Sequence, residues 1–317
     1  ISYSMRNHSQ KNFESIRADV SKLLNGEGYM EVMNNSLSAL RYQELLPENE
    51  KKSGVHMLNP LSQDLAVLRQ RMLWGAMENV AYNVNRQTAD LRFFEFGRTY
   101  AKSEKGYLEK SCLALTLTGA RYAENWDRLR DKTSLYDLRA VVQELIIRAG
   151  LEGELKESVL DSTILEDGTV FEVRGKELAR VGKVNAKTRK AFDVKQEIFH
   201  VEIDWHLLCT FSDSKSFKLQ EIPKFPAVRR DLSLLLDTSV RFAEIKDVAQ
   251  RSGGKLLKDV LLFDVYEGKS LPDGKVSYAI GFIIQDETST LTDKVVEKLM
   301  HEVQANLEKE FKAELRQ

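Results

Sequence analysis

Apolar residues recur at helical or strand spacing along the first two hundred residues, and the two spacings alternate. This pattern predicts a mixture of helices and antiparallel strands. Ser134 followed by Asp137 is typical of a capped helix start, and Gly150 stands where a helix commonly ends. The predicted helices span 13–24, 65–84 and 135–148, and the predicted strands span 29–32, 92–101, 112–119, two segments within 169–185, and 198–204, with 102–110 as a polar loop.

In the last hundred residues, strand and helix patterns follow one another in the order β-α-β-β-α-β. Gly253 and Gly254 end the first helical pattern, and the turn residues 267–274 separate two long strands. This order predicts a ferredoxin-like domain. The predicted elements span 232–236, 242–251, 256–266, 275–285, a helix that starts after 290, and an edge strand within 311–315.

The chain therefore has an α+β pattern with two parts. A length of 317 residues suits two domains of ordinary size, and a hydrophobic content of 42% supports packed cores. The polar stretch 212–216 indicates where the two parts join. We predict an antiparallel-sheet domain over 1–211, a linker over 212–222 and a ferredoxin-like domain over 223–317.

Charge and cysteine content exclude several classes of protein. The 47 basic residues balance 48 acidic ones, so the chain has no polyelectrolyte character. Cys112 and Cys209 are far apart, which disfavours a disulfide framework or a zinc site and predicts a reducing, cytoplasmic location. The sequence contains no apolar run long enough to span a bilayer, and residues 1–10 are too polar for a signal peptide, so no membrane partner is expected.

The segment 200–206 is the strongest candidate for a metal site. His200, Glu202, Asp204 and His206 alternate with apolar residues, so they are predicted to share one face of a strand. Successive positions on one face lie about 6.6 Å apart, so at most two of these side chains could reach one ion. We therefore interpret the segment as an amphipathic strand with a solvated or interface-facing polar side, with metal binding as the alternative.

The sequence shows no other strong catalytic signature. Neither a G-x-G-x-x-G after a strand nor a Walker A motif is present, so a nucleotide-binding fold of those types is not predicted. Two further pairs of charged residues are interpreted as ordinary surface positions, namely Glu95 with Arg98 and Asp64 with Glu78.

Four strings in the C-terminal part resemble the ferredoxin-like anticodon-binding domain of bacterial phenylalanyl-tRNA synthetase β chains. The element order alone would be weak support, because many unrelated functions use it. The strings are Phe225-Pro226 with Arg230-Asp231-Leu232, then Leu262-Phe263-Asp264-Val265-Tyr266-Glu267-Gly268, Leu271-Pro272-Asp273-Gly274-Lys275-Val276-Ser277 and Thr290-Leu291-Thr292-Asp293.

The N-terminal part resembles the synthetase-like module that precedes this domain in the same family. Its strings are Asn59-Pro60-Leu61-Ser62, Leu68-Arg69-Gln70-Arg71-Met72-Leu73-Trp74-Gly75 and Arg92-Phe93-Phe94-Glu95-Phe96-Gly97-Arg98-Thr99-Tyr100. The resemblance covers nearly the whole chain but not the tRNA-binding, DNA-binding-like and editing domains that the family places earlier. A first residue of Ile fits an excised fragment of such a chain.

The resemblance implies that this part supports catalysis without performing it. An active class II module would place an arginine for the ATP α-phosphate where Ala101 stands, and 198–209 lacks both the glycine and the arginine of the third motif. ATP, Mg²⁺ and phenylalanine would then bind the α chain of the complex, and no cofactor or catalytic residue is assigned here. The α chain is the expected protein partner, through the apolar helix face of Phe13, Ile16 and Val20.

The resemblance also implies contact with phenylalanine tRNA. Asp264, Tyr266, Ser277 and Ser233 match positions that read the anticodon, with the tyrosine stacked on its first base. Net charge does not predict this contact, since 16 Lys and Arg stand against 17 Asp and Glu from residue 218 onward. Local basic residues around the first strand are expected to contact phosphate, and they are Lys224, Arg229 and Arg230, with Lys215 and Lys218 nearby.

Two other classes of function share this fold. A small-molecule-sensing regulatory protein would favour a glycine-rich loop after the first strand, whereas 237–240 contains no glycine. A structural module that docks only on protein is the second alternative, and charge does not separate it from an RNA-binding domain. DNA is not an expected partner.

Overall fold

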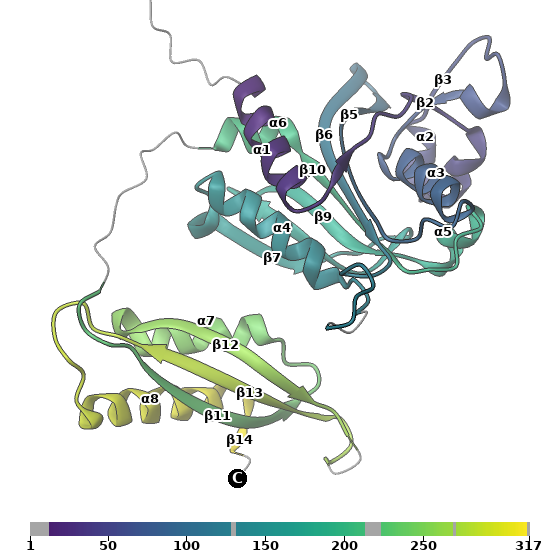
Figure 1. The fold of residues 1–317 in the computed structure, drawn as a ribbon. Coiled ribbons are helices and arrows are strands. Elements are labelled where there is room, and N and C mark those ends of the chain that lie inside the picture. The colour runs from purple at the N-terminus through teal and green to yellow at the C-terminus, as the bar shows by residue number, and fades with distance from the viewer. Residues whose placement is uncertain (1–12, 128–130, 213–222, 269–270, 316–317) are drawn as a thin grey trace, which may run out of the picture. The chain divides into compact units, whose positions relative to one another are not determined.

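The computed structural model describes residues 13–127, 131–212, 223–268 and 271–315. The chain forms two compact units, Ile1–Ser216 and Phe217–Gln317, drawn in Figure 1. The predicted linker 212–222 lies almost entirely outside the described residues, so its bounds stay a prediction. Among the helices that the structure describes, none is both long and apolar enough to cross a bilayer.

The N-terminal unit is built on a seven-stranded sheet in the order β1-β5-β6-β10-β9-β8-β7. The short β1 runs parallel to β5, and the other neighbours are antiparallel. The strands are β1 (Met30–Glu31), β5 (Leu91–Ser103), β6 (Gly106–Thr118), β7 (Leu155–Val159), β8 (Leu165–Val173), β9 (Lys176–Val184) and β10 (Ile198–Asp204).

Helices cover both faces of this sheet because alternate strand residues are apolar on each side. On β5, Phe94 packs into a core shared with α1, α4 and α6, whereas Phe93 packs into a second core with α3. The helices are α1 (Phe13–Gly26), α3 (Leu73–Val84), α4 (Leu135–Arg148), α5 (Ala186–Ala191) and α6 (Trp205–Phe211). Between β1 and α3 lie β2 (Leu37–Ser38), η1 (Leu40–Leu45), α2 (Glu48–Lys52), β3 (Val55–His56), η2 (Gln63–Leu65) and β4 (Val67–Leu68), and η3 (Glu152–Glu154) precedes β7.

Local signals in this unit were reliable, and two element bounds were not. The capping box of Ser134 and Asp137 is confirmed, and Gly150 follows α4 with a φ of 73°. The helix predicted from Leu65 begins at Leu73 instead, after a short strand. The predicted loop 102–110 is wrong as well, because β5 and β6 continue through it to a tight turn and their polar side chains there are solvated on both faces.

The C-terminal unit has the predicted β-α-β-β-α-β order. Its four strands form an antiparallel sheet in the order β12-β13-β11-β14, and buried residues of both helices form one core with the sheet. Its elements are β11 (Val228–Asp237), α7 (Phe242–Gly253), η4 (Gly254–Leu256), β12 (Leu257–Tyr266), β13 (Lys275–Ile284), α8 (Asp293–Phe311) and β14 (Glu314–Leu315). With the antiparallel sheets of the first unit, these elements confirm the α+β fold class.

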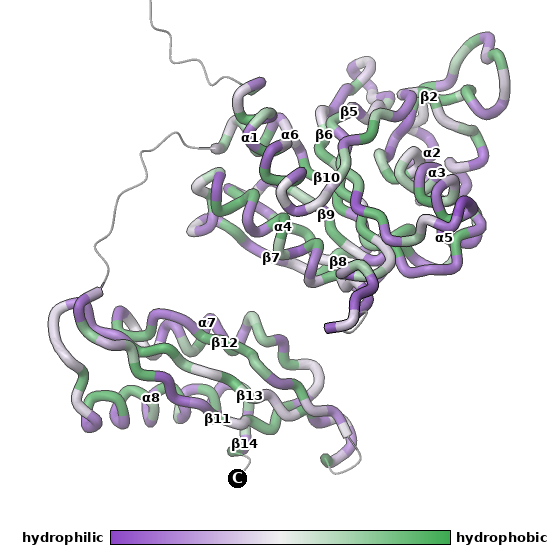
Figure 2. Tube along the Cα trace, viewed as in Figure 1, coloured by the Kyte–Doolittle hydropathy of each residue, from purple (hydrophilic) through white to green (hydrophobic). Residues whose placement is uncertain are grey.

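Both helices of this unit lie on the same face of its sheet. Figure 2 shows α8 alternating between hydrophobic and hydrophilic colour, as expected of a helix with one buried stripe. On the sheet, Leu234, Leu236, Ile280 and Phe282 face these helices and are fully buried. Because side chains alternate, the residues between them point to the opposite face.

Candidate functional site

The opposite face of the C-terminal sheet gathers all four residues predicted to read an anticodon. Tyr266 pairs directly with Ser277, while Asp264 and Ser233 flank Ala279 from the two sides. Directly paired residues of antiparallel strands point to the same side of the sheet. These four side chains therefore share one face, which we call the uncovered face and which also carries Asp231, Phe263 and Gly281.

A β-bulge places the two residues of β12 on this face. Val260 and Leu262 point toward the helices, and strict alternation would send Asp264 and Tyr266 the same way. The pairing register shifts between Leu262 and Asp264, with Phe263 as the extra residue. The shift turns Asp264 and Tyr266 to the uncovered side, which is the usual effect of a bulge.

Exposure differs sharply among the four residues. The Tyr266 ring remains 41% exposed, and Asp264 is exposed as well. The turn supports the ring, because a Cβ at Gly268 would lie 2.6 Å from the Tyr266 hydroxyl oxygen. Ser277 is only 4% exposed, and its Oγ lies 3.4 Å from Oγ of Ser233. Tyr266 and Asp264 are thus the accessible members, whereas Ser277, beside Tyr266 on β13, is buried.

The three residues predicted to bind phosphate do not form one cluster. Arg229 lies on the uncovered face, where its Nε donates to Oδ1 of Asp231 at 2.8 Å. Arg230, one residue further, points to the helix side, and its Nη2 lies 3.6 Å from Asp293 at the start of α8. Lys224 is exposed ahead of the strand, and Lys215 and Lys218 lie outside the described residues.

In the N-terminal unit, the sheet face beside α3 is closed by buried charge. Glu95 and Arg69 are almost fully buried and form an ion pair of 2.8 Å, and Asn34 donates to the second carboxylate oxygen. Gly97 makes room for the pair, since a Cβ there would lie 2.2 Å from Arg69 Nη2. The interpretation of Glu95 as a surface charge beside Arg98 is therefore wrong: Arg98 pairs with Glu109 in the exposed hairpin.

The segment 200–206 also differs from its prediction. His200 is buried with Nδ1 2.8 Å from Oγ1 of Thr116, and Asp204 caps α6. His206 leaves the strand entirely, because it lies in α6 with its ring edge-on to Phe13. The four polar residues thus do not share a solvated face. The residues that the structure describes contain no group of three or more side chains placed to hold a metal.

Glu202 has a structural task at this face. Its Oε1 accepts hydrogen bonds from the amides of Met72 at 2.7 Å and Leu73 at 3.2 Å, and these amides open helix α3. Burial by itself raises the pKa of Glu202, but the His200 ring 3.6 Å from Oε1, the charge of Arg71 and the Leu73 amide outweigh burial and lower the pKa to about 2. The carboxylate therefore fixes the start of α3, which explains why that helix begins later than predicted.

One small cavity borders this sheet face. A cavity of about 20 Å³ lies beside His200, Glu202, Arg71 and Arg180. That is the volume of roughly one water molecule. Ala101, where the resemblance implies an ATP-binding arginine, lies in the β5–β6 hairpin opposite Leu108.

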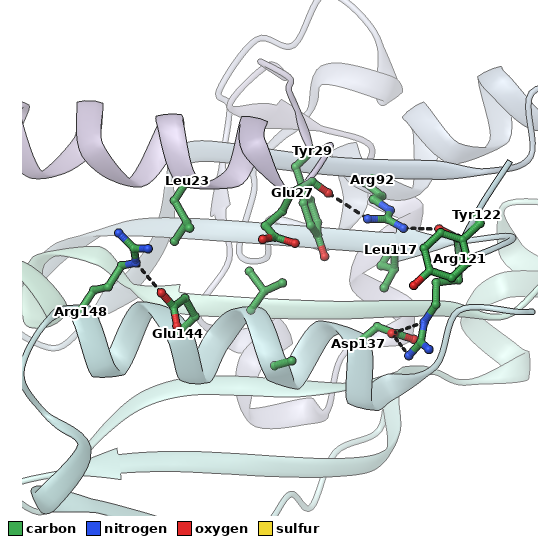
Figure 3. A pocket seen from close by; sticks show the side chains of 12 residues that line it. Leu23, Glu27, Tyr29, Arg92, Leu117, Arg121, Tyr122, Asp137, Glu144 and Arg148 are labelled. Carbon is green, nitrogen blue, oxygen red and sulfur yellow. Dashed lines mark hydrogen bonds and ion pairs between the residues drawn. The ribbon is translucent and has the colours of Figure 1, made fainter. Parts of the chain in front are cut away.

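A larger cleft of about 450 Å³ lies between α1 and α4, over the ends of β5 and β6 (Figure 3). Its arginines are already engaged: Arg92 donates to the Glu27 carbonyl, Arg121 to Asp137 and Arg148 to Glu144. An anionic ligand would have to compete with these contacts. The cleft is lined by Leu23, Glu27, Tyr29, Arg92, Leu117, Arg121, Tyr122, Asp137, Ala140, Val141, Glu144 and Arg148.

The apolar face of α1 that was predicted to meet a partner packs within its own unit. Phe13, Ile16 and Val20 are partly buried against the core beneath α1. This face therefore already has an internal role, and its role as an interface stays a prediction.

Comparison with known proteins identifies the family. The model of the phenylalanyl tRNA synthetase beta chain CLM domain matches residues 2–205, and that of the ferredoxin-fold anticodon binding domain matches residues 223–316. The chain belongs to the phenylalanyl-tRNA synthetase β-chain family. The resemblance inferred from the sequence strings is thereby confirmed.

Individual relatives align with most of the chain. It is 42% identical to the phenylalanine–tRNA ligase β subunit of Bacteroides fragilis over 312 residues, 94% of this chain and 38% of that protein. It is 30% identical to the subunit from Thermotoga maritima over 297 residues, 93% of this chain and 37% of that one. The chain thus spans less than two fifths of these relatives. Among solved structures, the pyrrolysyl-tRNA synthetase of Desulfitobacterium hafniense aligns with a TM-score of 0.49 and 17% identity, over 64% of this chain and 69% of that one.

Sequence reasoning missed two residues of the uncovered face, Phe263 and Asp231. Both stand inside strings that carried the family resemblance, but no local signal marks the bulge that exposes Phe263. A pattern read with period 2 assigns Phe263 to one face and its neighbours to the other, so the register shift was not predictable from it.

Proposed function

We propose that this chain forms the C-terminal part of a phenylalanine–tRNA ligase β subunit. In this role it binds the anticodon of phenylalanine tRNA and docks the catalytic α chain, acting in the cytoplasm. The observation that carries the proposal is the uncovered face, where Tyr266, Asp264 and Ser233 lie together in a unit that matches an anticodon-binding domain. The match of residues 223–316 to an anticodon-binding domain also disfavours the alternative function, a small-molecule-sensing regulatory protein.

The chemistry of this face suits an unpaired RNA loop. An exposed tyrosine ring offers a plane on which a splayed base stacks, and a carboxylate accepts hydrogen bonds from the N–H groups of a base edge. Tyr266 and Asp264 are adjacent on this face and exposed, so one base can meet both. Lys224 and Arg230 supply positive charge for the RNA backbone, Arg230 from the helix side of β11, where its ion pair with Asp293 is 3.6 Å long. The 2.8 Å hydrogen bond of Arg229 to Asp231 suits Arg229 less to that task.

The N-terminal unit supports the complex structurally in this proposal. The sheet face beside α3 is filled by the Arg69–Glu95 pair and by the contacts of Glu202, and Ala101 offers no cation to a nucleotide. Adenylation, with its ATP, Mg²⁺ and phenylalanine, is therefore assigned to the α chain.

A binding titration tests the proposal. Labelled phenylalanine tRNA and the same tRNA with a substituted anticodon are titrated against the chain at fixed salt, because phosphate contacts make RNA affinity strongly salt-dependent. The native anticodon should bind more tightly, since only base contacts distinguish the two RNAs. Equal affinities would reject anticodon reading and favour a module that docks only on protein.

A further inference from the structure

Phe263 is exposed on the uncovered face without a packing role. It is the extra residue of the bulge in β12, and its side chain is 51% exposed. It belongs neither to the buried core of this unit nor to the apolar residues packed against that core. The core of this unit therefore does not hold the Phe263 ring in place.

Arg229 lies over the Phe263 ring. Its guanidinium carbon is 4.9 Å from the ring centre, within the range of a cation–π contact. Asp231 holds the guanidinium at its edge, by accepting the 2.8 Å hydrogen bond from Nε. Two flat groups from different strands thus lie against each other on this face.

Gly281 lets this arrangement lie close to the sheet. A Cβ at Gly281 would come within 3.1 Å of Asp231 Oδ1 and 3.2 Å of Arg229 Nε. These distances are tighter than most real contacts, so a larger residue would require both side chains to shift by a few tenths of an ångström. The absence of a side chain on β13 therefore allows Arg229 and Asp231 to rest across the central strand.

The local charge favours a nucleobase over a phosphate as the occupant. Asp231 offsets the charge of Arg229 and would repel a phosphate, whereas stacking needs only the flat faces of the guanidinium and the ring. Aromatic rings and arginine planes are the surfaces on which proteins stack unpaired RNA bases.

The register separates this surface from Tyr266. Tyr266 pairs with Ser277, whereas Asp231 pairs with Gly281, four residues further along β13. Four residues of an antiparallel strand span about 14 Å. Phe263 lies in the bulge between the rows of Ile280 and Ala279, so its ring is offset along the strand from the ring of Tyr266 and toward Arg229. Asp264 and Ser233 lie between them, on the row of Ala279.

We propose that Phe263 and Arg229, held by Asp231, form a second stacking site for an unpaired base of the RNA loop that Tyr266 engages. This inference rests on the proposed function, and it replaces the phosphate role first expected for Arg229. The face then holds the loop at two separated bases, with Asp264 between them.

Three substitutions in the full chain test the site. Phe263→Leu keeps apolar bulk but removes the aromatic plane, and Arg229→Lys keeps the charge but removes the planar guanidinium. Each should weaken binding of a phenylalanine tRNA anticodon stem-loop by roughly 5- to 100-fold, the scale of one lost base–aromatic stack. The slope of affinity against salt should not change, because no charge is lost. Arg229→Gln should bind no better than Arg229→Lys.

Stem-loops with a single abasic nucleotide identify the base. At one loop position, removal of the base should abolish the effect of Phe263→Leu on affinity for the stem-loop. Removal of the base at a different position should abolish the effect of Tyr266→Leu. Finding both patterns at the same position would overturn the proposal.

Other outcomes separate this inference from the proposed function. If Tyr266→Leu weakens binding but Phe263→Leu and Arg229→Lys do not, the second site does not exist and anticodon binding stands. If Arg229→Lys binds as wild type and Arg229→Gln lowers the salt slope by about one, Arg229 contacts a phosphate and the stacking role is rejected. If the wild-type chain does not distinguish the native loop from a substituted one, the proposed function itself fails.

Discussion

Several polar strand residues are buried in the N-terminal sheet of this chain, and several are exposed on one face of the C-terminal sheet. On the N-terminal sheet, His200, Glu202 and Glu95 lie under α3 and the segments that precede it, and both carboxylates and Nδ1 of His200 bind protein groups. On the C-terminal sheet, Asp264 and Tyr266 lie on a face that both helices leave uncovered. A polar strand face therefore indicates a ligand site only where no distant segment covers it.

The physical reason lies in the cost of burying charge. A carboxylate removed from water destabilises the fold unless cations and N–H groups surround it, so buried polar residues become fixed parts of the structure. An exposed carboxylate or ring keeps its water and contributes little to folding, so a ligand can reach it. Substitutions should therefore affect stability on the first sheet and binding on the second.

The largest effect is expected at Glu202. Glu202→Leu leaves the amides of Met72 and Leu73 without an acceptor, and should reduce the free energy of unfolding by roughly 2–6 kcal/mol, about 1–3 kcal/mol for each unsatisfied buried donor. Urea unfolding followed by tryptophan fluorescence measures this unit selectively, because Trp74, Trp126 and Trp205 all lie in it. Glu109→Gln in the exposed hairpin is the control and should cost less than about 1 kcal/mol.

The pH dependence checks the same residue. Since the folded pKa of Glu202 lies near 2, below its ordinary value of 4.5, its contribution is complete above pH 4.5 and is lost as the pH falls toward 2. Glu202→Gln should remove this part of the acid sensitivity. An unchanged acid transition in this variant would show that the closed face does not depend on the Glu202 charge.

The next effect is expected at α1. Ile16→Asp with Val20→Asp should lower the stability of the N-terminal unit by about 1–3 kcal/mol, because this face packs on the unit's own core. Asp19→Ala on the exposed side of the same helix is the control. If the double variant keeps its stability but no longer co-elutes with an α chain, the face serves the partner and the internal assignment is wrong.

Tyr266→Ala should show the reverse behaviour. Loss of one stacking ring should weaken binding of phenylalanine tRNA by roughly 1–3 kcal/mol, with the thermal stability of the C-terminal unit nearly unchanged. Tyr107→Ala, an exposed ring in the N-terminal hairpin, should leave RNA affinity as it is. A Tyr266→Ala variant that loses stability without losing affinity would make Tyr266 a packing residue and remove the contrast between the sheets.

The smallest effect is expected at Arg230. Its ion pair with Asp293 is exposed, so Arg230→Ala should cost less than about 1 kcal/mol of stability. If Arg230 contacts RNA phosphate, the variant should bind native and substituted anticodons equally less well, with a salt slope lower by about one. Asp293→Asn should keep the wild-type slope. Loss of discrimination between the anticodons in Arg230→Ala would place Arg230 at a base instead.

The sequence by itself determined the features that depend on near neighbours. The capping box of Ser134 and Asp137 forms because its partners are three residues apart, and the β-α-β-β-α-β order follows from apolar period within single elements. The strings around Asp264, Tyr266 and Arg230 carried the family, which the comparisons confirmed.

Only the tertiary structure decided which faces are open. Glu202 accepts a hydrogen bond from the amide of Met72, 130 residues away in the sequence. This contact fixes the start of α3 and buries the polar side of β10, so the prediction of a solvated face for 200–206 is wrong. The bulge at Phe263 turns Asp264 and Tyr266 away from the helices, although their spacing alone fits either face. Periodicity shows which residues share a side of a strand, but register and coverage depend on long-range packing, and these decide whether that side meets solvent.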